Sequence, residues 1–122
     1  NKPSDVVGFL EPVYRGLEKE AFLTILLTAR NAAMGVDLVL LGCLNSSLVH
    51  PREVFRLPLI MATASIIFSH NHPSQDPSVS AEDMELTKRL VEVGKTIGIE
   101  VVDHIVYGNL ERYVSFKEKG LL

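Results

Sequence analysis

The sequence predicts a single domain of the α/β or α+β class, built on a mixed β-sheet flanked by helices. Its 122 residues are enough for one core of ordinary size, and 47% of them are hydrophobic against 22% charged. Segments with helical periodicity alternate with short apolar runs typical of strands, and two such runs follow one another near the front of the chain. No internal repeat or low-complexity tract interrupts this pattern.

The N-terminal segment, residues 1–17, is predicted to be a helix or a linker. Ser4 can cap a helix whose apolar residues recur at helical spacing, with Pro12 inside it. The chain opens without Met and without a basic and apolar leader, so we interpret the segment as the remainder of a longer protein from which an upstream domain has been removed. The domain itself is then expected to cover residues 18–122.

Two strands, a short helix and a third strand are expected next. The apolar, β-branched runs at residues 21–29 and 36–46 predict a β-hairpin. Pro51 suits the first position of a helix, with His50 directly before it. The segment ASIIFS, residues 64–69, predicts a short buried strand.

The last third of the chain predicts a helix followed by two strands. Ser80 and Asp83 are spaced as a capping box, and the apolar residues behind them indicate a helix that ends near Gly94 or Gly98. The segments IEVVDHIVYG and YVSF are expected to form the last two strands, joined by a turn.

Composition and charge argue against several classes of protein. The longest apolar runs fall well short of the roughly 20 residues of a transmembrane helix, so no membrane span is expected. The formal net charge of -3 gives no basic footprint for nucleic acid, so DNA binding by this domain is not expected. The single cysteine, Cys43, lies in an apolar run, which favours a buried thiol and a reducing, cytoplasmic location.

Two histidines one residue apart, His70 and His72, follow the strand predicted at residues 64–69. Side chains at positions i and i+2 of an extended chain point the same way, so both imidazoles can face one point. Asp83 can fold back over them across the loop 73–79. Two histidines and one carboxylate leave a tetrahedral zinc one open position, as in catalytic sites, where zinc lowers the pKa of water to about 7 and a nearby carboxylate can act as the base.

A purely structural interpretation of these residues remains open from their spacing alone. Ser80 and Asp83 would form a capping box without any metal, and a histidine in a loop is more often a surface residue than a ligand. His50, at a helix start, and His104, within a strand, are interpreted as structural, and a role in supporting the metal ligands is the alternative.

The pattern His-Asn-His at residues 70–72 followed by Ser80 and Asp83 resembles the signature of the JAMM (JAB1/MPN/Mov34) metalloenzymes, where the residue between the histidines is more usually Ser or Thr. The segments LNSSLVHPREVF, HNHPS, GIEVVDHIVYG and YVSFKEKGLL are together similar to the C-terminal domain of RadC-family proteins, which bacteria carry and which are traditionally labelled DNA repair proteins. The resemblance covers about residues 18–122. It implies the JAB/MPN fold, a cytidine-deaminase-like mixed sheet flanked by helices.

The chain departs from the family pattern in the loop after the histidines. Gln75 stands where the family usually has Gly, and Val79 where it often has Pro. Neither position is a proposed ligand, but both bear on how the loop folds over the metal.

The resemblance also implies the roles of individual residues. It assigns the zinc ligands to His70, His72 and Asp83, and it implies that Ser80 helps to hold the oxyanion of a tetrahedral intermediate in addition to capping its helix.

The resemblance further implies a glutamate at the start of the first core strand that acts as general base and acid. Glu20 is the candidate because it directly precedes the apolar strand, and Glu18, on the same strand face, is the fallback. Glu53, at a predicted helix start, is interpreted as a charge that favours the helix dipole.

The leading hypothesis is therefore a zinc-dependent hydrolase of the JAMM type, cleaving a peptide or isopeptide bond in a peptide or protein substrate. One alternative is a metal-binding protein-interaction module without catalysis. Another is an accessory factor or nuclease in DNA repair or recombination, although a nuclease often uses two metals and the carboxylates for a second one are lacking.

Overall fold

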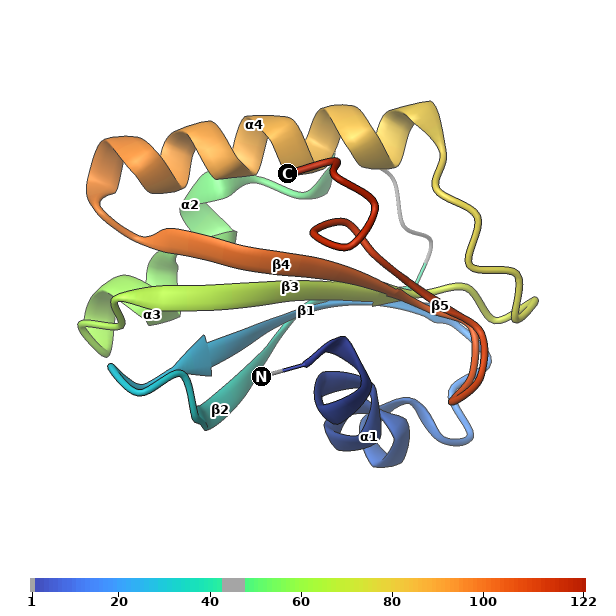
Figure 1. Ribbon diagram of the computed structural model, residues 1–122. Helices are drawn as coiled ribbons and strands as arrows, with labels where there is room; N and C mark the ends of the chain where they lie inside the picture. The colour runs from blue at the N-terminus through green and yellow to red at the C-terminus, as the bar shows by residue number, and fades with distance from the viewer. Residues whose placement is uncertain (1, 43–47) are drawn as a thin grey trace.

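A five-stranded mixed sheet runs through the molecule in the order β2-β1-β3-β4-β5 (Figure 1). The computed structural model describes residues 2–42 and 48–122. The strands are β1 (Glu20–Leu27), β2 (Ala33–Gly42), β3 (Ser65–Asn71), β4 (Glu100–Tyr107) and β5 (Tyr113–Ser115). Among these described strands only β3 and β4 pair in parallel, and they are joined by helix α4 (Ala81–Ile97), the kind of crossover that a parallel pair requires. The predicted class, a mixed sheet flanked by helices, is confirmed.

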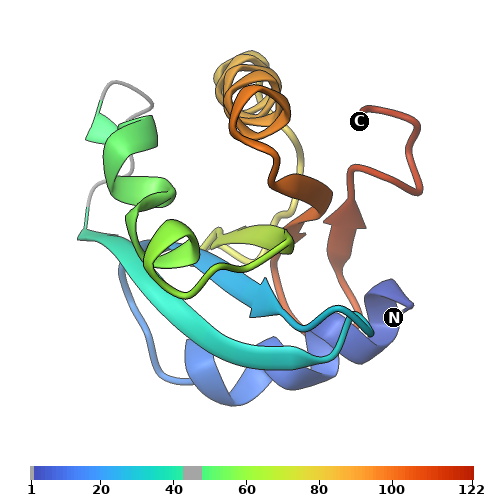
Figure 2. The ribbon, with the colours of Figure 1, turned by 90° about the vertical axis from the view of Figure 1, so that its left-hand side faces the viewer.

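Helices cover both faces of the sheet (Figure 2). Helix α1 (Pro3–Tyr14) lies on one face, and α4 lies on the other together with α2 (Pro51–Val54) and α3 (Arg56–Ile60). The central strands are therefore apolar on both sides: Leu23 packs in the core cluster under α1, and Phe22 packs in the cluster under α4. This explains why strand β1 reads as an almost unbroken apolar run.

Helix α1 begins two residues earlier than a Ser4 cap requires. Its N-cap is Lys2, which makes no side-chain capping hydrogen bond, and Pro3 takes the first helical position. Proline suits that position because its φ is already helical and it has no N–H to satisfy, so Ser4 falls inside the first turn and the predicted cap is wrong. Val7, Leu10 and Tyr14 are buried against the sheet. The domain boundary between residues 17 and 18 stays a prediction.

The hairpin is confirmed, but the start of its second strand was predicted too late. Strand β2 begins at Ala33 because Leu26 and Leu27 already pair with Gly35 and Ala33, although the segment RNAAMG looks like a turn in sequence. The tight turn is closed instead at Asn31, whose φ is 61°. Residues 43–46 of the predicted strand, and with them the prediction of a buried Cys43, lie outside the described residues.

The helix expected at Pro51 is two short helices, with a break at Phe55. Pro58 explains the break, because it has no N–H to donate to the carbonyl of Val54. His50 is the N-cap residue of α2, as predicted.

Helix α4 follows its sequence signals at both ends. The reciprocal capping box of Ser80 and Asp83 is formed, and of the two predicted ends the second is used: Gly98 closes the helix in the left-handed conformation with φ 80°. None of the helices in the described part of the chain has the length and apolar character needed to cross a bilayer.

Candidate metal centre

Three side chains meet where β3 ends and α4 begins. His70 is the penultimate residue of strand β3, and the backbone N–H of His72 donates to the carbonyl of Tyr107 at 2.9 Å, which extends the pairing with β4 by one residue. His70 and His72 therefore point to the same face of the sheet, the face covered by α4. Asp83, on the first turn of α4, reaches back toward them.

The ligand atoms of His70, His72 and Asp83 all lie within 4.8 Å of one another. The Nε2 atoms of His70 and His72 are 3.5 Å and 3.9 Å from Asp83 Oδ2. The convergence expected from the sequence is thus present in the fold. These residues form a group that could hold a metal ion, and their role as zinc ligands stays a prediction.

The hydrogen bonds around the two rings suit a metal site. His72 Nδ1 lies 2.6 Å from the backbone oxygen of Asp76, which can only accept, so Nδ1 carries the proton and Nε2 presents a lone pair. His70 Nε2 is buried and has no hydrogen-bond partner among the described residues. A buried ring nitrogen without a partner is costly, and a bound cation beside a carboxylate would satisfy it.

Asp83 combines the cap and the metal site in one carboxylate. Its Oδ2 accepts from the Ser80 N–H at 3.1 Å and also faces both histidines, while its own N–H donates to Ser80 Oγ at 3.0 Å. Burial alone would raise the pKa of Asp83, but the neighbouring His70 and the Ser80 contacts outweigh burial and hold the pKa well below its ordinary value. The capping and metal interpretations therefore do not exclude each other.

Glu20, the candidate base, is the first residue of β1. Phe22 pairs with His70 in the antiparallel register, and continuing that register by two residues would bring Glu20 opposite His72. The ring of Phe22 stacks on that of His70 at 6.5 Å between centroids, and Glu20, two residues earlier, points to the same face. Glu18 precedes the strand, so its predicted place on the strand face is wrong. Catalysis by Glu20 or Ser80 stays a prediction.

Asn71, between the two histidines, fixes the backbone on both sides of Glu20. Its Oδ1 accepts from the N–H of Ala21 at 2.6 Å, and its Nδ2 donates to the carbonyl of Lys19 at 3.2 Å. In the sequence Asn71 stands out only as a departure from Ser or Thr, and this contact is not predicted from it. The available signal was a carboxamide at a strand end, which can donate and accept at once.

The loop after His72 is held by the turn between β4 and β5. Gln75 has a φ of 67°, a conformation that favours Gly, which is the residue usual at this position in the family that the sequence resembles. Its side-chain oxygen accepts from Asn109 Nδ2 at 3.0 Å. Next to it, a Cβ on Gly108 would lie 2.6 Å from the carbonyl oxygen of Gln75.

Replacing Gly108 by alanine is expected to displace this loop, because its Cβ would also lie 2.7 Å from the carbonyl oxygen of Arg112. The displaced loop carries the Asp76 carbonyl that orients His72, so zinc affinity should fall about 10 to 100-fold. Competition with a chromophoric chelator measures it. Gly35→Ala, where a Cβ meets nothing within 4 Å, is the matched control, and equal affinity of the two variants would contradict the expectation.

A pH effect on stability is expected from His104, which is fully buried. Burial, with a smaller contribution from His70, lowers its pKa well below 6.5, so below that pH the unfolded chain takes up a proton that the folded chain does not. The free energy of unfolding should therefore fall as the pH drops from about 6.5, by at most about 1.4 kcal/mol per pH unit from this group. Urea unfolding of metal-free protein between about pH 7 and pH 5 measures this, and a flat profile would contradict it.

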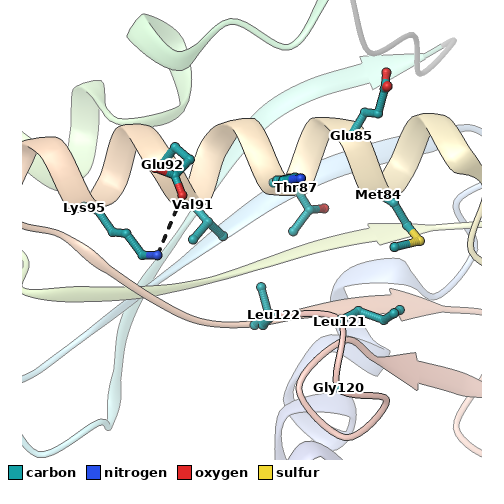
Figure 3. Close-up of a pocket in the computed structure, with 10 residues that line it drawn as sticks. Met84, Glu85, Thr87, Val91, Glu92, Lys95, Gly120, Leu121 and Leu122 are labelled. Atoms are coloured by element: carbon teal, nitrogen blue, oxygen red, sulfur yellow. Dashed lines mark ion pairs between the residues drawn. The ribbon is translucent and has the colours of Figure 1, made fainter.

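A groove of about 520 Å³ runs along α4 (Figure 3). Met84, next in sequence to Asp83, and Val91 line it from the helix, and Leu121 and Leu122 face them from the C-terminal segment. Glutamates and lysines of α4 also line the groove, so charges of both signs border its apolar part.

A five-stranded mixed sheet with helices on both faces, carrying a His-His-Asp group at a strand end and a helix start, defines a domain of the JAB class with a candidate metal site. The family model of the RadC-like JAB domain matches residues 1–121. The chain therefore belongs to the RadC-like JAB domain family.

Its relatives include several proteins named UPF0758. The one from Moorella thermoacetica is 50% identical over 120 residues, which are 98% of this chain and 52% of the relative. The one from Bacillus cereus strain AH187 is 49% identical over 118 residues, 97% of this chain and 52% of the relative. The one from Methanosarcina mazei is 46% identical over 122 residues, 100% of this chain and 53% of the relative. The chain thus spans about half the length of the curated relatives that it matches.

Proposed function

We propose that this domain is a zinc-dependent hydrolase of the JAMM type, acting as a metallopeptidase or isopeptidase. The observation that carries the proposal is the convergence of two imidazole nitrogens and Asp83 Oδ2 within 4.8 Å, with His70 Nε2 buried and without a hydrogen-bond partner among the described residues. Nitrogen and carboxylate oxygen donors suit zinc, and three protein ligands are the number found in catalytic zinc sites.

The surrounding residues supply the groups that peptide hydrolysis needs. Zinc held by the three ligands would supply Lewis acidity and lower the pKa of water to about 7. Glu20, at the start of β1 and two residues before Phe22 on the same strand face, would accept a proton as general base and pass it to the leaving amine as general acid. Ser80 Oγ accepts the Asp83 N–H but keeps its own proton, which it would donate to the oxyanion of the tetrahedral intermediate.

The substrate that fits best is a peptide or protein. The groove along α4, whose lining includes Met84, the residue after Asp83, combines apolar side chains with charges of both signs, which suits a peptide chain better than a polyanion. The net charge of -3 also argues against DNA contact by this domain. Gel shifts should therefore show no DNA binding, even at low salt.

A metal-binding interaction module without catalysis is the second candidate. It is favoured by one observation: within the described chain, the group of converging ligand atoms includes His70, His72 and Asp83 but not the Glu20 carboxylate. In this case zinc would bind and no substrate would be cleaved.

The test is a screen of fluorogenic peptide and isopeptide substrates with the metal-free protein and the zinc-reconstituted protein. We expect cleavage only with zinc, loss of cleavage on adding a chelator, and recovery on restoring zinc. Cleavage that persists without metal would overturn the proposal. Stoichiometric zinc binding without cleavage of any substrate would favour the interaction module.

A further inference from the structure

A chain of hydrogen bonds links the buried face of His70 to helix α4. His70 Nδ1 lies 2.8 Å from His104 Nε2, and His104 Nδ1 lies 2.5 Å from Thr87 Oγ1. Thr87 Oγ1 in turn donates to the backbone oxygen of Asp83 at 2.9 Å. This series of hydrogen bonds therefore connects the candidate ligand His70 to the backbone of the candidate ligand Asp83. The two residues between them, His104 and Thr87, are not candidate ligands themselves.

The donor and acceptor in each of these hydrogen bonds follow from the last acceptor, the backbone carbonyl of Asp83. A backbone carbonyl can only accept, so the Thr87 hydroxyl donates its one proton to the backbone oxygen of Asp83. The same hydroxyl must therefore accept a hydrogen bond from His104 Nδ1–H. His104 Nε2 then holds a lone pair and accepts from His70 Nδ1–H. The proton of a neutral His70 ring is thus held on Nδ1, and Nε2, the nitrogen that faces Asp83, is then a lone pair.

The imidazole of His104 is fixed by its neighbours. It stacks on the ring of Phe116 with 4.6 Å between centroids, and Phe22 and Phe68 contact it edge to face at 5.9 Å and 6.1 Å. Aromatic rings offer no acceptor comparable to a carbonyl, so the two ring nitrogens of His104 depend on Thr87 and His70 for their hydrogen bonds. The ring is therefore held in place, and the hydrogen bond from its Nδ1 to Thr87 determines which nitrogen of His70 carries the proton.

We propose that Thr87 and His104 are positioning residues that hold His70 in the tautomer with its proton on Nδ1, so that Nε2 is available to a metal ion. The proposal rests on the proposed metal function, because it assigns these two residues a role through His70. Without the Thr87 hydroxyl, the proton of His104 can move to Nε2. His70 Nδ1 would then have to accept, its proton would move to Nε2, and that nitrogen could no longer bind a cation.

The test compares three variants on the same helix. Thr87→Val removes the hydroxyl at nearly constant volume, and Thr87→Ser restores it. Thr96→Val is the matched control, because Thr96 makes the same type of hydrogen bond to the carbonyl four residues earlier, at 3.1 Å to Glu92, in an exposed position. Two quantities are measured for each: zinc affinity by chelator competition, and the protonated ring nitrogen of each histidine by long-range proton–nitrogen NMR of the metal-free protein.

In the metal-free wild type we expect His70 and His104 to carry their protons on Nδ1. Thr87→Val should lose this arrangement and bind zinc about 10 to 100-fold more weakly, while Thr87→Ser and Thr96→Val stay close to the wild type. A structural role of Thr87 alone would lower stability without changing the tautomer of His70.

Two results would overturn the proposal: a wild-type His70 with its proton on Nε2, or a Thr87→Val protein with unchanged tautomers and unchanged zinc affinity. The wild-type spectrum decides even if the valine variant does not fold. If the wild type binds no zinc but shows both predicted tautomers, the metal function fails while the positioning of His70 stands, so the two failures are distinguishable.

Discussion

Replacing His72 by alanine is expected to weaken zinc binding by at least about 100-fold while leaving the domain folded. Structural zinc sites with four protein ligands gain roughly 10–16 kcal/mol, so each ligand accounts for about 2.5 to 4 kcal/mol. The His72 side chain is 21% exposed and lies outside both core clusters, so its removal leaves no large cavity. Chelator competition measures the affinity, and circular dichroism checks the fold.

His50→Ala is the control for the His72 variant, because His50 is exposed at the start of α2 and is not part of the ligand group. Its zinc affinity should equal that of the wild type. Equal affinities in the two variants would mean that zinc, if bound, is held elsewhere in the chain.

Glu20→Gln should lower the rate of hydrolysis by about 10² to 10⁴-fold and leave zinc affinity nearly unchanged. Glutamine keeps the size and polarity of the side chain but cannot take up a proton, and Glu20 is not part of the ligand group. The separation of the two effects distinguishes a proton-transferring residue from a ligand. Turnover of any substrate found in the screen, measured with zinc saturating, gives the comparison.

Glu18→Gln and Glu53→Gln complete the experiment on the base. Glu53 lies in the first turn of α2, so its variant should retain full activity and serves as the control. Glu18 lies before β1, and its replacement should have a smaller effect than that of Glu20. Loss of activity in the Glu18 variant alone would show that Glu18, and not Glu20, is the general base.

Most of the sequence-based predictions that proved correct depended on residues close together in the chain. The capping box of Ser80 and Asp83, the final glycine of α4 and the alternation of side chains at His70 and His72 depend on residues close together in the chain, so their geometry follows from helix and strand periodicity. The convergence of His70, His72 and Asp83 on one point was predicted from the same helix and strand periodicity.

The predictions that failed were decided by tertiary contacts or by a single proline. Pairing with β1 extends β2 back to Ala33, and Pro58 divides one predicted helix into two. The supporting contacts of the site were also missed. Asn71 bonds to a backbone 50 residues away, and His104 reaches His70 across 34 residues, distances at which periodicity gives no information.

The central claim, that His70, His72 and Asp83 hold one zinc ion, is tested most directly by titrating zinc into the metal-free protein in a calorimeter. We predict a single site with about one zinc per chain, and its loss when the three residues are replaced together by alanine. No binding in the wild type, or the same stoichiometry and affinity in the triple variant, would contradict the claim.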